Sequence, residues 1–122
     1  MAEKDVKLRF RKLKKNTDFD MEVIWSAKAK ITYFKVLEYL DVNWTKKEII
    51  QFNHRTEIVI LSIQGNPEMF PASLKYKKIR KAFVDKNNSF FYTVDKQNKK
   101  IHLLTFFDNR QNPAKLNPEK LI

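Results

Sequence analysis

The sequence has no cysteine, one glycine and two histidines among its 122 residues. Without cysteine, disulfide scaffolds, thiolate zinc sites, cysteine nucleophiles and iron–sulfur clusters are all excluded. The single glycine, Gly65, is too few for a Walker phosphate loop or a dinucleotide-binding fingerprint, because both need several glycines where backbone approaches phosphate. The two histidines lie far apart, with no carboxylates at the spacing of a metal site. We therefore expect neither a metal nor a cofactor.

Long apolar runs are also missing. No stretch approaches the roughly 20 residues of a membrane span, and the N-terminus lacks the apolar segment of a secretory signal. We expect a cytoplasmic protein with no membrane partner.

Positive charge and aromatic residues are abundant. Lys and Arg number 25 against 14 Asp and Glu, which gives a formal charge of +11, and 43% of the residues are hydrophobic. The apolar content is enough for one folded domain, and the charge favours a polyanion or an acidic protein as partner.

Residues 1–20 differ in composition from the rest. Seven basic residues and two acids lie between Met1 and Lys15, and Val6, Leu8 and Phe10 alternate with charged residues. We interpret 1–20 as a basic N-terminal extension: an edge strand, a flexible arm or a remnant outside the domain. Residues 21–122 then form a single domain.

Two helices are predicted after a short strand over 21–25. Ser26 is a good N-cap for a helix from Ala27 to about Leu40, whose buried face would carry Ile31, Phe34 and Leu37. Thr45-Lys46-Lys47-Glu48 is a capping box that begins a second helix. Its predicted apolar stripe is Ile49, Phe52, Thr56, Val59 and Ile63, and Gly65 would end it in the left-handed conformation.

The second half predicts an antiparallel meander with strands over 74–84, 89–96 and 100–108. Alternation places Phe90, Tyr92 and Val94 on one face of the middle strand. In the last strand it places Ile101, Leu103 and Phe107 opposite Leu104 and Phe106. The fold class is therefore α+β, with the meander packed on the helix hairpin. Because both faces are apolar and the helices cover one, something else would cover the other.

Basic residues cluster in the first meander strand. Residues 75–81 carry five positive charges in seven positions. Strand alternation would send Lys75, Lys77 and Lys81 to one side and Lys78 and Arg80 to the other. Such a cluster suits phosphates or an acidic peptide, whereas a solvated edge strand protected by lysines is the alternative. His102 is predicted to face the same side as Arg80. Arg110 ends the last strand and suits bidentate binding of phosphate or carboxylate, or a structural pair with Asp108.

The order and spacing of several segments resemble the RelE/ParE superfamily, the toxins of type II toxin–antitoxin modules. The resemblance spans about 21–116 and rests on Val23-Ile24-Trp25-Ser26-x-x-Ala29, Tyr39-Leu40 with Trp44, Ile79-Arg80-Lys81, Phe91-Tyr92-Thr93-Val94 and the closing stretch from Leu103 to Pro113. It implies a small basic toxin that inhibits growth, with a cognate antitoxin wrapped around its sheet face and helix hairpin.

The superfamily implies two kinds of target. RelE-like members cut messenger RNA on the ribosome without metal, and here Arg80, Arg110, Lys75 and Lys77 would be the catalytic residues. Lys78, Lys81, Tyr92 and His102 are the residues predicted to bind phosphate or the target. ParE-like members poison DNA gyrase and lack the catalytic set. Since no Tyr or His follows Arg110 to serve as a terminal base, the sequence favours the ParE-like function. A basic nucleic-acid-binding domain without toxicity is the third alternative.

Overall fold

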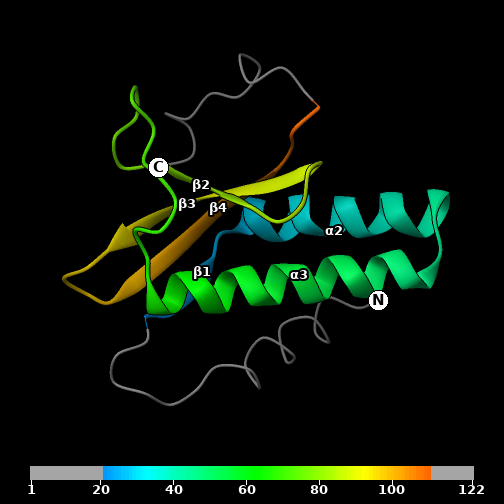
Figure 1. The fold of residues 1–122 in the computed structure, drawn as a ribbon, viewed down its shortest axis with the longest axis horizontal. Coiled ribbons are helices and arrows are strands. Elements are labelled where there is room, and N and C mark those ends of the chain that lie inside the picture. The colour runs from blue at the N-terminus through cyan, green and yellow to red at the C-terminus, as the bar shows by residue number, and fades with distance from the viewer. Residues whose placement is uncertain (1–20, 111–122) are drawn as a thin grey trace.

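The computed structural model describes residues 21–110, so the predicted extension over 1–20 and the tail from Gln111 lie outside the described residues. The elements are β1 (Glu22–Trp25), α2 (Ala27–Asn43), α3 (Lys46–Gly65), β2 (Arg80–Phe83), β3 (Asn88–Asp95) and β4 (Lys100–Asp108). The helices lie side by side in one layer and the sheet forms the second (Figure 1). The α+β class and the meander packed on a helix hairpin are confirmed.

The sheet has the strand order β1-β4-β3-β2 within the described part of the chain. β2, β3 and β4 form the antiparallel meander, while β1 pairs with β4 in parallel, with Val23 opposite Ile101. The N-terminal strand therefore makes the sheet mixed and occupies its β4 edge. The helices between β1 and β2 then cross one face of the sheet.

Both helices begin where their caps predict. Ser26 Oγ accepts a hydrogen bond from the Ala29 N–H at 2.9 Å, and the capping box of Thr45 and Glu48 is present. The predicted role of Gly65 is wrong, since no glycine has a positive φ. The last turn of α3 is closed by the Asn66 N–H, which donates to the Ser62 carbonyl at 2.9 Å, so no left-handed residue is needed there.

The buried face of α2 matches the predicted one only in part: Leu37 is buried and Phe34 packs partly buried against the core, but Ile31 does not. Ala29, Tyr33 and Leu37 are buried, whereas the side of the helix with Ile31 faces solvent and Ile31 is 56% exposed. Residues four apart, such as Ala29 and Tyr33, lie on one face of a helix. Ile31 is two positions from each of them, so it points about 200° away around the helix axis. The face of α3 is predicted well: Ile49, Phe52, Thr56 and Ile63 are buried, and Val59 packs partly buried against the core.

The core between the helices and the sheet is aromatic. Tyr33 lies 4.9 Å from Phe106 and 5.5 Å from Phe52 between ring centroids, and Phe90 lies 5.3 Å from Phe106. The Tyr33 hydroxyl donates to Asn53 Oδ1 at 2.6 Å, so its polar end is satisfied inside the core. This packing fixes which side of the sheet the helices cover.

The first meander strand is much shorter than the predicted 74–84. Residues 74–78 form a turn in which Ser73 Oγ accepts hydrogen bonds from the backbone N–H groups of Lys75 at 3.2 Å and Tyr76 at 3.0 Å. The serine side chain thus offers the backbone an alternative to strand pairing. The ladder with β3 begins only at Arg80.

A β-bulge changes the alternation in β4. Phe91 pairs with Thr105, but Tyr92 pairs with Leu103, so Leu104 is an extra residue in β4. Phe106 therefore joins Ile101 and Leu103 in the helix-covered core, and Phe107 lies on the other face. The predicted faces of Phe106 and Phe107 are corrected accordingly.

Helix α2 covers the edge of β4 where β1 ends. The Ser26 N–H donates to the Leu103 carbonyl at 3.0 Å, and Ser26 Oγ donates to the Leu104 carbonyl at 2.9 Å. Further along, the Phe106 N–H donates to Thr32 Oγ1 at 2.9 Å. Side chains of α2 therefore satisfy the strand edge that no neighbouring strand reaches. None of the helices within 21–110 is long and apolar enough to cross a membrane.

Candidate functional site

Arg80 lies on the helix-covered side of the sheet, opposite Tyr92 in the register of β2 and β3. Its Nη1 donates to the Phe70 carbonyl at 2.5 Å and to the Glu68 carbonyl at 3.4 Å, and Nη2 lies 3.7 Å from the Glu68 carboxylate. The side chain is 20% exposed. Arg80 therefore anchors the loop that follows α3, and its guanidinium is largely engaged there.

Tyr92 anchors the same loop. It is fully buried, and its hydroxyl donates to the Pro67 carbonyl at 2.8 Å. Burial raises the pKa of the Tyr92 phenol, because the charged phenolate would lose its hydration. Lys96 forms an ion pair with Glu68 on the outside of this loop. In this arrangement Tyr92 contacts the loop rather than an external ligand.

Lys81 lies on the uncovered face of the sheet among three aromatic rings. Its Nζ is 5.3 Å from the ring centroid of Phe83, 5.8 Å from that of Phe91 and 5.2 Å from that of Phe107. Such distances suit cation–π attraction. These four residues, here called the Lys81 cluster, come from all three strands of the meander, and Phe83 is 52% exposed. The cluster presents one positive charge in an aromatic surface.

His102 shares this uncovered face. It is paired with Ile24 on β1 and Thr93 on β3, one position from the buried Leu103. Neighbouring residues in a strand point to opposite faces, so His102 and Arg80 lie on opposite sides of the sheet. The prediction that they share a side is wrong.

The lysines before Arg80 are exposed and lie on a turn. Lys75, Lys77 and Lys78 belong to the turn after Ser73, and Lys75 Nζ lies 5.5 Å from the Tyr76 ring centroid. The predicted strand alternation does not apply to these three residues. Their long side chains reach solvent from a short turn and form a basic rim beside β2.

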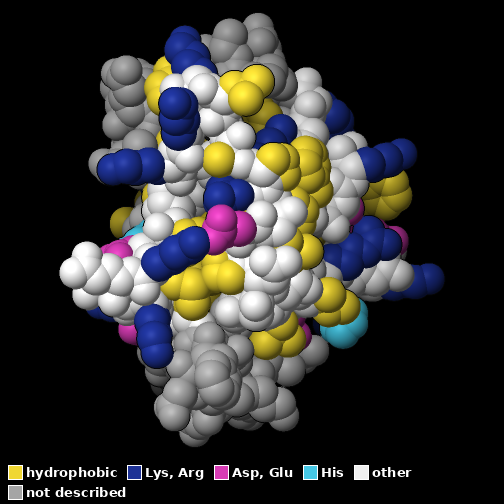
Figure 2. All heavy atoms as spheres, turned by 60° about the vertical axis from the view of Figure 1, so that its left-hand side comes forward, with side chains coloured by type: hydrophobic (Ala, Val, Ile, Leu, Met, Phe, Trp, Pro, Cys, Tyr) yellow, Lys and Arg dark blue, Asp and Glu magenta, His cyan; other side chains and the backbone are white. Residues whose placement is uncertain are grey.

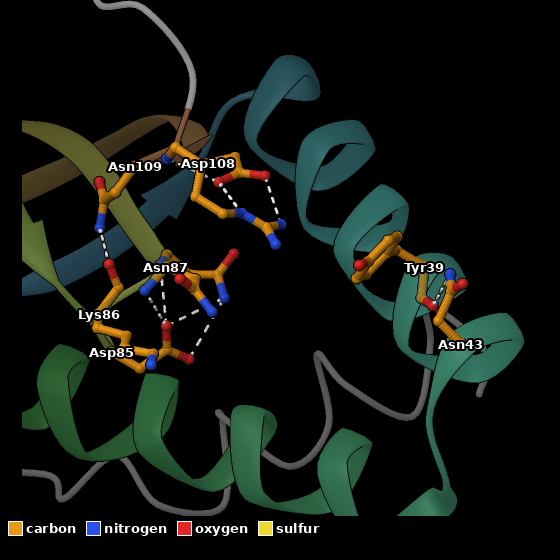
Figure 3. Close-up of polar contacts among 9 residues, drawn as sticks. Tyr39, Asn43, Asp85, Lys86, Asn87, Asp108 and Asn109 are labelled. Atoms are coloured by element: carbon orange, nitrogen blue, oxygen red, sulfur yellow. Dashed lines mark hydrogen bonds and ion pairs between the residues drawn. The ribbon is translucent and has the colours of Figure 1, made fainter.

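Arg110 lies at the far end of the sheet, next to α2. Its Nε and Nη2 donate to the two Asp108 carboxylate oxygens at 2.9 and 2.7 Å, and its guanidinium carbon lies 5.8 Å from the Tyr39 ring centroid. Figure 3 shows Asp108 at the end of β4 and Tyr39 on α2, with the turn at Asp85 to Asn87 below Asp108. The Asp108 hydrogen bond raises the pKa of Arg110 and lowers that of Asp108.

The structure does not bring the two arginines together. Arg80 is level with Tyr92 on β3, whereas Asp108 is level with Asn88. Four residues of strand span about 13 Å. Arg80 also faces the loop after α3, while Arg110 faces the end of α2. Within residues 21–110 there is no group of three or more His, Asp or Glu side chains that would hold a metal ion.

The chain resembles a known protein in its fold but matches none by sequence. No protein-family model matches the sequence, and no curated protein matches it. Among solved structures, a chain of the toxin–antitoxin complex RelBE2 from Mycobacterium tuberculosis is similar, with a TM-score of 0.52 and 11% sequence identity. The match covers 80% of this chain and 100% of that chain. The protein has a RelE-like fold.

The RelE-like fold agrees with the resemblance read from the sequence. The strand, helix hairpin and meander occur in the expected order, and β1 and β4 form the parallel pair that joins the two ends of the described chain. The pattern of segments was thus informative about architecture even though the identity is 11%.

The surface of this RelE-like fold carries scattered charge. Figure 2 shows Lys and Arg side chains distributed around apolar patches, with few acidic side chains on that face. Sequence reasoning selected Lys81 but missed its three rings. Pairing the two strands in register would have placed Phe91 beside Lys81, whereas the position of Phe107 depends on the bulge at Leu104.

Proposed function

We propose that this chain is the toxin of a type II toxin–antitoxin module, inhibiting growth and neutralised by a cognate antitoxin protein. The observation that carries the proposal is the fold, since the similar solved chain belongs to a toxin–antitoxin complex and is covered along its whole length. The formal charge of +11 suits an acidic partner. Controlled expression with a viability readout tests toxicity.

Target binding without RNA cleavage fits the site better than nuclease chemistry. Stabilising a scissile phosphate requires positive groups that converge on it. Here Arg80 is held by the Phe70 and Glu68 carbonyls and Arg110 by Asp108, at different ends of the sheet. The Lys81 cluster instead offers an aromatic face around one cation, and aromatic residues such as Phe are enriched at protein interfaces. We propose that this face engages the target, with DNA gyrase as the candidate.

A supercoiling assay with purified gyrase tests this function. Wild type is expected to inhibit supercoiling at stoichiometric concentrations, and Lys81→Glu is expected to lose inhibition because it reverses the charge within the Lys81 cluster. Lys35→Glu, an equal charge change at an exposed position of α2, is the control. Unaffected gyrase at an excess of wild-type protein contradicts the proposal.

Ribosome-dependent cleavage of messenger RNA is the second candidate, with Arg80 and Arg110 at the phosphate and Lys75 or Lys77 in proton transfer. The exposed lysine turn beside β2 favours it, because those ammonium groups are accessible to RNA. Primer extension on translated message is the test. Cleavage that depends on Arg80 and Lys77 supports this function, and absence of cleavage from a toxic protein excludes it.

A further inference from the structure

A pocket of about 210 Å³ opens between the loop end of the helix hairpin and the turn joining β2 to β3. Its lining includes Tyr39, Trp44, Gln51, Arg55, Asn87 and Arg110. We call it the hairpin-end pocket; Figure 3 shows the part of its lining that contains Tyr39, Asp85 and Asn87. Its floor is formed by the core residue Phe52 with Val36 and Leu40, and no residue of the Lys81 cluster lines it. Its volume is below that of pockets for drug-sized ligands, so it can enclose one small planar group, and the rest of a larger ligand would lie at its mouth.

Two aromatic rings of the pocket are exposed. Trp44 is 57% exposed and Tyr39 is 46% exposed. Trp44 is held between the helices by its backbone N–H, which donates to the Leu40 carbonyl at 2.8 Å. Large exposed rings at a concave site are suited to stacking against the face of a planar ligand.

Polar groups of the pocket are available to a ligand. Among the described residues, the side chains of Gln51, Arg55 and Asn87 have no hydrogen bond or ion pair. Arg110 gives two of its N–H donors to Asp108, which leaves others on the same guanidinium. The pocket therefore combines two guanidinium groups with two side-chain amides.

The carboxylates that line the pocket are engaged elsewhere. Glu48 accepts the backbone N–H of Thr45 at 2.9 Å in the capping box. Asp85 Oδ1 accepts the backbone N–H groups of Asn87 at 2.8 Å and Asn88 at 2.9 Å within its own turn. Both carboxylates are nevertheless negative, so an anionic ligand must place its charge toward Arg55 and Arg110.

We propose that the hairpin-end pocket binds one nucleotide, either free or as part of single-stranded RNA. The base stacks on Trp44 and Tyr39, and its edge bonds to the amides of Gln51 and Asn87. Arg55 and Arg110 hold the phosphate. A single apolar side chain from a protein partner would leave these amides and guanidinium groups without a partner. Proteins commonly recognise an unpaired RNA base by stacking it on an aromatic ring and forming hydrogen bonds to its edge.

The pocket supplies its own reporter for the test. The sequence has two tryptophans, and Trp25 is stacked on Phe106 at 5.5 Å in the interior. Stacking of a base on Trp44 is expected to quench its fluorescence saturably. The purified full chain is titrated with the four ribonucleoside 5′-monophosphates and with a single-stranded RNA hexamer. A higher affinity for the hexamer than for the monophosphates assigns the site to single-stranded RNA, and equal affinities assign it to free nucleotides.

Variants connect the response to the pocket. Trp44→Phe is expected to abolish the quenching, since Trp25 does not face the pocket. Calorimetric affinity is expected to fall about five- to a hundredfold in Trp44→Ala. It should also fall in Arg55→Gln but not in Lys75→Gln, a similar charge loss on the turn before β2. Circular dichroism checks that each variant is folded.

Three results overturn the inference: no saturable response to any nucleotide or the hexamer, an unchanged response in Trp44→Phe, or an equal loss of affinity in Lys75→Gln and Arg55→Gln. Saturable binding of an acidic peptide with one central Phe, without nucleotide binding, assigns the pocket to a protein partner instead. These measurements need neither antitoxin nor target. Their failure is therefore distinguishable from failure of the proposed toxin function.

Discussion

Replacing Thr32 with valine tests how α2 seals the sheet. Thr32 Oγ1 accepts the Phe106 N–H at 2.9 Å and donates to the Lys28 carbonyl at 2.8 Å. Valine keeps the branched shape but removes the acceptor, so the Phe106 N–H loses its partner at a strand edge covered by the helix. Leaving a buried donor unpaired costs about 1–3 kcal/mol. We expect Thr32→Val to lower the free energy of unfolding by that amount.

Urea unfolding followed by tryptophan fluorescence measures the loss, because Trp25 packs on Phe106 near this contact. Thr32→Ser is the matched control: it keeps the hydroxyl and removes one methyl group, which costs about 0.8 kcal/mol or less. Amide exchange at Phe106 is expected to accelerate in Thr32→Val only. If Thr32→Val is no less stable than Thr32→Ser, water satisfies this N–H and the claim that α2 seals the edge of β4 is refuted.

Three further predictions follow from the loop and the two ends of the sheet. Arg80→Ala removes the bonds to the Phe70 and Glu68 carbonyls, so we expect faster proteolysis of 66–72 than in Lys77→Ala; equal cleavage rates would argue against an anchoring role. Arg110 lowers the pKa of Asp108 below its ordinary 3.8, so the contribution of this pair is present above about pH 4 and is lost as the pH falls through the folded-state pKa. The melting temperatures of wild type and Asp108→Asn should therefore converge in acid, and a constant difference from pH 2 to 7 would contradict this. Burial raises the pKa of Tyr92 above its ordinary 10.0, so stability is lost as the pH rises beyond about 10, and Tyr92→Phe should lose less over that alkaline range than wild type.

Local signals predicted the helices and the class of fold. Ser26 and the capping box of Thr45 and Glu48 act within a few residues, so the sequence identifies both helix starts. The face of α3 was predicted because its buried positions have uninterrupted spacing. The face of α2 was predicted correctly at Phe34 and Leu37 but wrongly at Ile31, because Ala29 and Tyr33 are less hydrophobic than Ile31 although they are the residues buried in the core.

The turn before β2 and the features that depend on distant residues were not predicted. The turn at Ser73 competes with a strand pattern that looks continuous up to Val84. The bulge at Leu104 appears only when β4 is aligned with β3, and it exchanges the faces of Phe106 and Phe107. The same holds for the site: Arg80, Lys81 and His102 were selected as chemical types, but their separation onto two faces follows from strand register.

The hairpin-end pocket shows why binding sites are harder to find than elements. Tyr39 and Arg110 are distant in sequence and meet because the end of β4 lies beside the last turns of α2. No motif marks Gln51 or Asn87 as partners of these residues.

Growth under controlled expression tests the central claim most directly. Expression of the full chain is expected to arrest growth, and co-expression of an acidic protein from the adjacent reading frame is expected to restore it and to co-purify with the chain. Normal growth at verified levels of folded protein, with no rescue and no complex to detect, would contradict the assignment as a toxin of a toxin–antitoxin module.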